Sequence, residues 1–292
     1  MKEIVLLTGG GTGIGAAFAE LLATHYNLQV LIIGRTASCL EEIANRSKNI
    51  EYFCADLTLD KDITNIIKFI NDKHYKVRYL VNNAAILNSS QLVDVSTERF
   101  LSSLHTNVVA PLQLVNKLLI SNILTDMAKV LMIDSSARYN LQEGIGLYGI
   151  SKAALYRLTL SMQDEFKNKL LIAIAYPGTI KNTLMSDEIK KSEIPALIAV
   201  RKQLKSILTK NPEIGALNPR EAAEFLAWIL CETSDEQFVY PQKYVKQGAS
   251  LTNPEEWDIR DCISYIGCPV THGTKLKGLL ESPINKYSTM ES

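Results

Sequence analysis

The sequence has no excess of either charge, since 31 lysines and arginines balance 31 aspartates and glutamates among 292 residues. Binding to nucleic acid or to an anionic membrane surface usually needs a basic surface, which this balance does not favour. No apolar segment approaches the ~20 residues that cross a bilayer. The first apolar run, from Ile4 to Leu7, ends at Thr8 and Gly9 and is too short for a secretory signal. We therefore expect a cytoplasmic protein without nucleic-acid or membrane partners.

Cysteine and histidine are scarce and follow no ligand pattern. The five cysteines form no C-x-x-C pair, and the four histidines are scattered. An odd number of cysteines without such pairs favours free thiols in a reducing compartment. Protein-bound zinc needs closely spaced Cys and His ligands, so we predict no metal site.

Short apolar runs rich in β-branched residues alternate with helical patterns through the first two-thirds of the chain. Runs that are apolar throughout are typical of strands buried on both faces of a parallel sheet. The expected strands are Ile4–Leu7, Val30–Ile33, Ile50–Cys54, Tyr79–Asn82, Val130–Ile133 and Leu171–Ala175, and helical patterns include Ala16–Ala23, Ile63–Ile70, Thr97–Ile120 and Gly149–Phe166. This order predicts an α/β fold: one Rossmann-type, doubly wound parallel sheet with helices on both faces.

The same patterns predict one catalytic domain over residues 1–240. A lysine-rich helical stretch at about 184–215 is expected to form a lid insertion. Residues 241–292 are richer in Pro, Gly, Thr and Asn and are expected to form a C-terminal extension. Its polar tail, from about Ser282, is predicted to be disordered.

A glycine-rich stretch, Thr8-Gly9-Gly10-Gly11-Thr12-Gly13-Ile14-Gly15, follows the first strand and opens a helix. Glycines permit a tight turn and a close backbone approach, and a helix N-terminus offers N–H donors to an anion. We predict that the residues Gly9, Thr12, Gly13, Ile14 and Gly15 bind the pyrophosphate of a dinucleotide. The alternative is a tight turn without a ligand.

The end of the second expected strand bears on the choice of cofactor. A cofactor with a free ribose 2′-hydroxyl usually meets a carboxylate there, but this chain reads Ile33-Gly34-Arg35-Thr36. The planar guanidinium of Arg35 suits a phosphate, so Arg35 and Thr36 predict NADP(H) in preference to NAD(H). The alternative is that Arg35 begins a solvated helix.

Asp56 and Leu57 follow the third expected strand, at the edge of the sheet where ligands bind. The Asp56 carboxylate has two candidate roles that do not exclude each other. It could accept a hydrogen bond from the adenine amino group, or it could cap the next helix.

Tyr148 and Lys152 are four residues apart, so on a helix they share one face. A nearby ammonium favours phenolate, which predicts a lowered pKa for Tyr148 and a proton donor useful near neutral pH. Ser135, thirteen residues before Tyr148, is placed to hold a carbonyl oxygen. The alternative is a surface pair on an amphipathic helix.

Taken together, these motifs resemble the short-chain dehydrogenase/reductase family from about Ile4 to Thr183. The matching residues are Thr8-Gly-x-x-x-Gly13-x-Gly15, Asp56, Asn82-Asn83-Ala84-Ala85, Asn107, Ser135, Tyr148-x-x-x-Lys152 and Pro177-Gly178. The resemblance implies a catalytic tetrad of Asn107, Ser135, Tyr148 and Lys152. In it Tyr148 donates the proton, Ser135 orients the carbonyl, Lys152 holds the nicotinamide ribose, and Asn107 binds backbone or water. It also implies cofactor contacts from Asn83, Ala84, Pro177, Gly178 and Ile180, and a homodimer or homotetramer.

The chain departs from the family pattern at two turns. Asp134-Ser135-Ser136 has Asp134 where serine is frequent, and aligning the two serines instead would make Ser136 the catalytic serine. In the turn after Pro177-Gly178, Asn182 stands where threonine is usual, with Thr183 one residue later. The segment beyond Tyr240 is longer than usual, and it either covers the substrate, joins subunits or lies on the surface.

The substrate is expected between the turn after Ser135, the Thr179–Thr183 turn and the lid. Candidate lining residues are Arg138, Tyr139, Gln142, Leu147, Leu184, Met185 and Leu197. Their mixture predicts a carbonyl compound with an apolar body, and Arg138 either meets an anionic group or lies on the surface. The leading hypothesis is an NADPH-dependent reductase of a ketone, aldehyde, quinone or diketone. The alternatives are a 3-oxoacyl thioester reductase and a non-catalytic protein that senses the dinucleotide.

Overall fold

The computed structural model describes residues 1–239 except 140, 179 and 199–216. The predicted C-terminal extension, its polar tail and the lid beyond residue 198 therefore lie outside the described residues. The division into domains stays a prediction.

The six predicted strands are present in one parallel sheet with the order β3-β2-β1-β4-β5-β6. Each contains or equals its predicted range: β1 Lys2–Thr8, β2 Val30–Gly34, β3 Ile50–Cys54, β4 Tyr75–Asn82, β5 Leu124–Ile133 and β6 Leu170–Ala175. The order reverses between β1 and β4. In such sheets the crevice at the carboxyl ends of the strands on either side of the reversal is where ligands bind.

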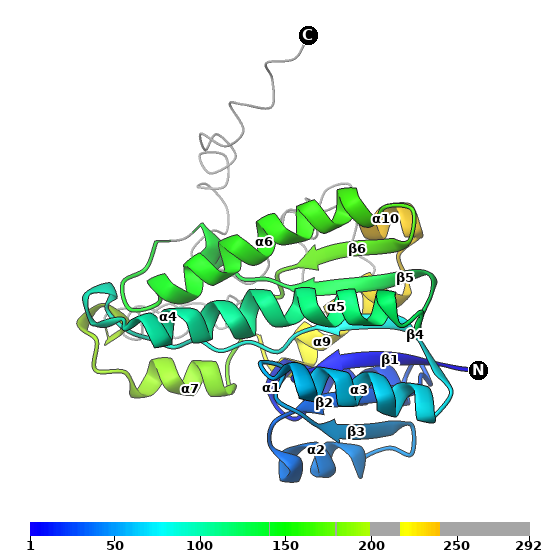
Figure 1. Cartoon of the computed structure of the whole chain (residues 1–292). Coiled ribbons are helices and arrows are strands. Elements are labelled where there is room, and N and C mark those ends of the chain that lie inside the picture. Colours follow the sequence, from blue (N-terminus) through cyan, green and yellow to red (C-terminus); the bar gives the residue numbers. More distant parts are fainter. Residues whose placement is uncertain (140, 179, 199–216, 240–292) are drawn as a thin grey trace.

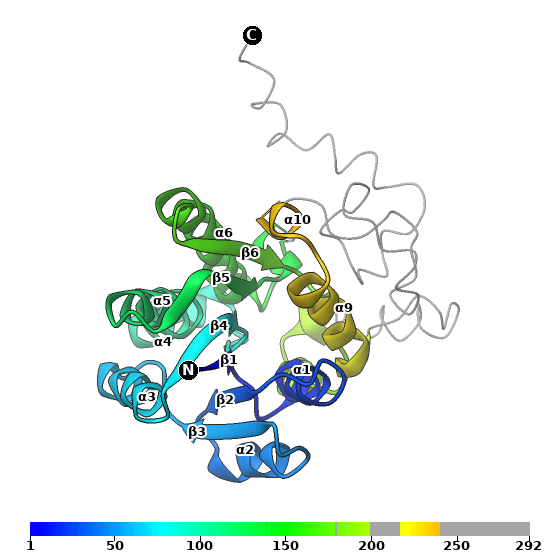
Figure 2. The same cartoon turned by 90° about the vertical axis from the view of Figure 1, so that its right-hand side faces the viewer.

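Helices cover both faces of the sheet, which confirms the predicted fold class (Figure 2). One face packs against α1 (Gly13–Thr24), α2 (Ala37–Ala44) and α9 (Pro219–Cys231), and the other against α3 (Asp60–Asp72), α5 (Ala110–Ile120) and α6 (Gly146–Phe166). The short helix α10 (Asp235–Val239) adds the fully buried Phe238 to the first face. Buried apolar side chains on both faces explain why strands such as β2 and β6 are apolar throughout.

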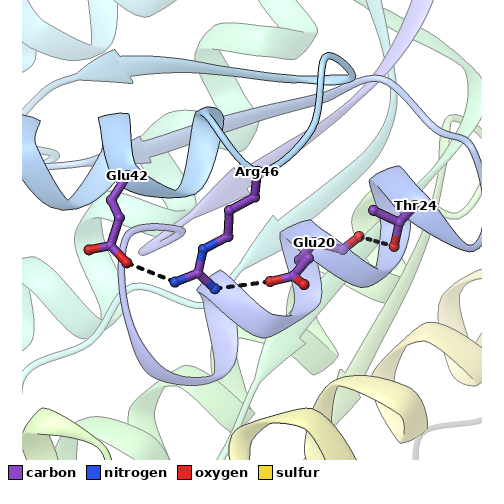
Figure 3. A network of polar contacts seen from close by, with 4 residues as sticks. All are labelled: Glu20, Thr24, Glu42 and Arg46. Atoms are coloured by element: carbon purple, nitrogen blue, oxygen red, sulfur yellow. Dashed lines mark hydrogen bonds and ion pairs between the residues drawn. The ribbon is translucent and has the colours of Figure 1, made fainter.

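Arg46, just after α2, connects the two helices that follow the first two strands (Figure 3). Its guanidinium lies 3.0 Å from Glu20 of α1 and 2.7 Å from Glu42 of α2. Both pairs are partly exposed, and exposed pairs of this kind contribute little to stability. The buried apolar contacts therefore carry the packing of α1 and α2.

The helix predicted over Thr97–Ile120 is interrupted. The structure has α4 (Thr97–Leu104), a π-helical turn η2 (His105–Val109) and then α5. The Ala110 N–H donates to the carbonyl of His105, five residues back, as in a π-turn. Pro111 has no N–H to offer the carbonyl of Asn107 and its ring crowds that position, which explains a break of the α-helical pattern here.

The lid region begins with α7 (Leu184–Lys191), beside the carboxyl end of the sheet (Figure 1). Thr183 Oγ1 accepts a 3.1 Å hydrogen bond from the Ser186 N–H and caps the helix. The helical pattern predicted from Leu184 is broken at residues 192–194 and resumes at 195–198. The base of the region is tied to the segment before α9, because the Lys181 N–H donates to the Leu217 carbonyl at 2.9 Å.

Candidate active site

The glycine-rich loop is compact enough that side chains would disrupt it. Gly9 and Gly13 have φ values of +69° and +55°, which favour glycine. A Cβ on Gly15 would lie 2.1 Å from the Gly9 carbonyl oxygen, far inside any real contact. The loop therefore requires glycine at these positions for its own geometry, and this leaves bare backbone at the carboxyl end of β1.

The N-terminus of α1 fits a bound pyrophosphate. Thr12 is its N-cap residue but makes no capping hydrogen bond, and the first turn carries no acidic side chain. The first N–H groups of a helix have no partner within it and carry partial positive charge. Thr12, Gly13, Ile14 and Gly15 can thus present these donors to a phosphate, as the sequence predicted.

Thr8 and Asn83 fasten the glycine-rich loop to the end of β4. The Thr8 hydroxyl accepts hydrogen bonds from the N–H groups of Asn83 (3.0 Å) and Ala84 (3.1 Å) and donates to the Val81 carbonyl at 3.3 Å. The Asn83 amide in turn donates to the carbonyls of Thr8 and Gly9, at 3.0 and 3.2 Å. The predicted cofactor residues Gly9, Asn83 and Ala84 are therefore adjacent.

Arg35, Thr36 and Asp56 lie near one another at the ends of β2 and β3. The Arg35 and Thr36 side chains are exposed, and Cys54 at the end of β3 donates its S–H to the Arg35 carbonyl. Burial raises the pKa of Asp56, but hydrogen bonds from Thr58 and the charge of Arg35 outweigh it and hold this pKa below its ordinary value. Arg35 is thus an exposed cation near an ionised carboxylate.

The capping role considered for Asp56 is wrong. Its Oδ1 accepts from the N–H (2.9 Å) and the hydroxyl (2.7 Å) of Thr58, forming a local turn. The N-cap residue of α3 is Leu59. The other predicted role, a contact with adenine, stays a prediction. Leu57 beside it is partly buried against the core.

The turn after β6 brings Thr183, and not the exposed Asn182, to the glycine-rich loop. Pro177 is buried and Gly178 has φ +90°, which turns the chain at the carboxyl end of the sheet. A Cβ on Gly13 would lie 3.3 Å from Cγ2 of Thr183. Ile180 pairs with Leu217 in an isolated bridge, so the backbone predicted to contact the nicotinamide is held in place.

Tyr148 and Lys152 both lie on the buried side of α6. Tyr148 is 8% exposed and Lys152 is 3% exposed, so the alternative of a surface pair is wrong. The Lys152 ammonium donates a 2.7 Å hydrogen bond to the Ile133 carbonyl at the end of β5 and lies 5.6 Å from the centre of the Tyr148 ring. The side chain of Ser135 is hydrogen-bonded to Tyr148, so the structure joins Ser135, Tyr148 and Lys152 in one cluster.

The prediction of a lowered Tyr148 pKa is wrong. Burial raises the pKa of this phenol, Asp134 raises it further, and the hydrogen bond with Ser135 lowers it only in part. Burial also lowers the pKa of Lys152 from its ordinary 10.5 to about 8, against the opposing charge of Asp134. Sequence alone showed a neighbouring ammonium but could not show that both groups leave water.

Asn107, in the π-turn, bonds to backbone as predicted. Its Oδ1 accepts from the Ile86 N–H and its Nδ2 donates to the Ile86 carbonyl, both at 2.9 Å. The same Nδ2 donates to Ser151 Oγ at 2.9 Å, and Ser151 donates to the Tyr148 carbonyl at 2.7 Å. Ser151 was missed by sequence reasoning. Its place beside Lys152, three residues after Tyr148, was the available signal.

Arg138 is not a surface arginine, because its side chain is largely buried. Its contact with an anionic group of the substrate stays a prediction. Its guanidinium lies 3.1 Å from the carboxylate of Asp134, and both side chains are largely buried. It also stacks over the ring of Tyr156 on α6, with 3.7 Å from the guanidinium carbon to the ring centre. Asp134, which the sequence marked only as a departure, is therefore part of a buried ion pair beside the cluster.

Lid residues pack on Tyr148. Tyr148 forms an apolar cluster with Leu87, Ile145 and Leu197, and Met185 packs against it. Of the other predicted lining residues, Leu184 is 70% exposed and Leu147 is fully buried on α6. The wall over Tyr148 is therefore aliphatic, built from the lid and the segments before α6.

No helix within the described part of the chain combines the length and apolarity that a bilayer crossing needs. Over those same residues, His, Cys, Asp and Glu side chains nowhere gather in threes as metal ligands do.

Comparison with known proteins agrees with the fold. Residues 3–194 match the family model for short chain dehydrogenases. An uncharacterized oxidoreductase of Staphylococcus saprophyticus is 26% identical over 63% of this chain and 81% of its own length. The 3-oxoacyl-[acyl-carrier-protein] reductase of Bos taurus is 26% identical over 67% and 84%. A solved structure of an actinorhodin polyketide ketoreductase with NADPH superposes with a TM-score of 0.67 over 78% and 90%, at 18% identity. With the family match covering most of the chain, this protein belongs to the short-chain dehydrogenase family of oxidoreductases.

Proposed function

We propose that the protein reduces a carbonyl group of a small apolar substrate to an alcohol with NADPH, with Tyr148 as the general acid. The observation that carries this is the cluster of the buried Tyr148 and Lys152 with the partly buried Ser135, adjacent to the end of β5 at the carboxyl edge of the sheet. A protein that only senses a dinucleotide would not need a proton donor there.

Each residue of the cluster has a separate task. The raised pKa of Tyr148 keeps the phenol protonated, which is the form that can give a proton to a carbonyl oxygen. The hydroxyl of Ser135, already bonded to Tyr148, can polarise the same oxygen. The ammonium of Lys152 stabilises the phenolate that forms as the proton leaves, because opposite charges attract strongly out of water. When bound, the nicotinamide supplies the hydride.

Asn107 and the glycine-rich loop position these groups. Asn107 anchors the segment after β4 to α6 through Ser151. The end of the sheet and the helix that carries Tyr148 therefore keep a fixed position relative to each other. Gly9, Gly13 and Gly15 admit the cofactor pyrophosphate, and Pro177, Gly178 and Ile180 hold the nicotinamide side. Holding groups at reacting distance is a large part of such catalysis.

The choice of NADPH rests on Arg35 and Thr36. Both are exposed at the end of β2, and within the described ranges no carboxylate forms an ion pair with Arg35. A guanidinium is well suited to the extra phosphate of NADPH. The actinorhodin ketoreductase was solved with NADPH, which is compatible with this choice.

The aliphatic wall of Leu87, Ile145, Met185 and Leu197 supports a substrate with an apolar body: a ketone, aldehyde, quinone or diketone. The named activity of the Bos taurus relative keeps a second candidate open, reduction of a 3-oxoacyl thioester. The expected homodimer or homotetramer stays a prediction.

The test is a carbonyl panel, including a 3-oxoacyl thioester, followed at the NADPH absorbance band with wild type and Tyr148→Phe. We expect wild type to turn over at least one compound, and Tyr148→Phe to bind NADPH nearly as well with turnover lost. If wild type binds NADPH and reduces nothing in the panel, the sensing function replaces the enzyme. In fluorescence titrations Arg35→Asp should weaken NADPH much more than NADH, and an equal loss for both would remove the assignment of the cofactor.

A further inference from the structure

A buried ion pair lies next to the catalytic lysine and has no part in the mechanism above. Asp134 directly follows β5 and is 5% exposed, and its Oδ2 lies 3.1 Å from Nη1 of Arg138, one turn later. Tyr156, whose ring stacks on Arg138, lies one turn beyond Lys152 on the same face of α6. The end of β5, the 3-10 turn η3 (Ser136–Arg138) and α6 thus hold the pair from three sides.

The Asp134–Arg138 pair is costly to bury, and its hydrogen bonds are incomplete. Burying a carboxylate is unfavourable unless it is paired and hydrogen-bonded. Arg138 pairs with Oδ2, but Oδ1 of Asp134 is buried with no hydrogen-bond partner among the described residues. A buried carboxylate with one unpaired oxygen is costly to the fold, which points to a role other than stability.

We relate this role to the position of the Asp134 carboxylate beside Lys152. Lys152 donates to the carbonyl of Ile133, the residue bonded to Asp134, so ammonium and carboxylate flank one peptide unit. The described groups that act on the Asp134 carboxylate are Arg138, Lys152 and the Ser135 backbone, and Tyr156 on α6 stacks on Arg138. Ser135, Asp134 and Tyr176 act on Tyr148, and Asp134 is the charged group that acts on Lys152.

We propose that Asp134, held by Arg138, is a positioning residue that keeps Lys152 and Tyr148 in their protonated forms and so extends carbonyl reduction to higher pH. The kinetic part of this inference rests on the proposed function. A nearby negative charge makes a proton harder to remove from either group. Burial lowers the pKa of Lys152 and Asp134 opposes that change, while burial and Asp134 both raise the pKa of Tyr148.

The pH range of this effect follows from the carboxylate itself. Burial raises the pKa of Asp134 to about 6, with Arg138 and Lys152 opposing. The carboxylate is therefore charged above about pH 6 and neutral below it. Removing the carboxylate alone should leave the protonation of Lys152 unchanged below about pH 6 and should affect it only at higher pH.

The decisive variant is Asp134→Asn with Arg138→Gln, which removes both charges, keeps the size of the aspartate and leaves a polar side chain at both positions. Asp134→Asn alone would leave a buried unpaired arginine, which risks misfolding. The matched control is Arg220→Gln with Glu224→Gln, an exposed pair on α9 with the same four-residue spacing. Thermal melting by circular dichroism establishes that both variants are folded.

The first measurement does not need activity. In protein labelled with [ε-¹³C]lysine, the Lys152 signal is assigned through Lys152→Arg and titrated with pH. We expect its midpoint to fall in the Asp134–Arg138 double variant by up to about one pH unit, the size of a single charge effect, because loss of the Arg138 charge offsets part of the loss of Asp134. We expect it to stay unchanged in the α9 control. In the second measurement, the alkaline limb of kcat/KM for carbonyl reduction should move to lower pH by the same amount.

An unchanged titration midpoint for Lys152 in the folded double variant would overturn the inference. The Asp134–Arg138 pair would then have only a packing role. Loss of activity in the double variant without a shift in the alkaline limb of kcat/KM would also overturn the inference. If wild type reduces no carbonyl compound, the proposed function fails, but the lysine titration still decides whether Asp134 controls the charge of Lys152.

Discussion

Lys152→Met should make the protein more stable at neutral pH, and the gain should shrink as the pH rises. Burial lowers the pKa of Lys152 in the folded protein from its ordinary 10.5 to about 8. A lysine with a lowered folded pKa binds fewer protons when folded than when unfolded between these two values. Stability from this group therefore rises with pH across that window and is at its lowest below about pH 8.

The size of the effect follows from the two pKa values. A shift of one unit corresponds to 1.36 kcal/mol, so the charged, buried lysine costs about 3 kcal/mol at pH 7, about 2 at pH 9 and about 1 at pH 10. Methionine has similar length and no charge, so its own contribution does not vary with pH. It also loses the hydrogen bond to the Ile133 carbonyl, which offsets part of the gain by an amount that is the same at every pH.

The assay is urea unfolding of wild type and Lys152→Met at pH 7, 8, 9 and 10, without cofactor. The difference in unfolding free energy between the variants should change by about 2–3 kcal/mol from pH 7 to pH 10. Using the difference cancels the other groups that titrate in this range, such as the partly buried thiol of Cys231. A difference that is constant across the range would refute the view that Lys152 is a desolvated ammonium.

Three further substitutions test the framework of the site. Gly15→Ala would place a Cβ 2.1 Å from the Gly9 carbonyl, so we expect NADPH binding to be lost in fluorescence titration, and retained affinity would disprove the close approach. Thr8→Val leaves two N–H groups after β4 without their acceptor and should cost about 1–3 kcal/mol in urea unfolding, whereas a neutral result would mean that Asn83 alone holds the loop. Asn107→Leu removes three hydrogen bonds and should lower both the melting temperature and kcat. An unchanged kcat would exclude a positioning role.

The sheet could be predicted because its signal is local. A run such as Val30–Ile33 is apolar at every position, and a strand buried on both faces is the element that satisfies that pattern at such short length. The glycine-rich loop was predictable for a similar reason, since its glycines follow from steric limits that the structure shows at Gly9 and Gly15.

Features that depend on distant segments could not be predicted. The raised pKa of Tyr148 comes from burial under Leu87 and Leu197, which a four-residue spacing cannot show. The pairing of Asp134 with Arg138 follows from η3, a turn with no sequence pattern of its own. Likewise, the approach of Thr183 to Gly13 depends on where α7 docks.

The π-turn at Asn107 behaves as one surplus residue accommodated within an otherwise regular helix. A one-residue deletion at Val108 or Val109 would close this wide turn. Asn107 lies in the turn, so its amide would shift and would no longer meet the Ile86 backbone. The chain length of this short segment is thus as much a part of the site as the identity of its asparagine.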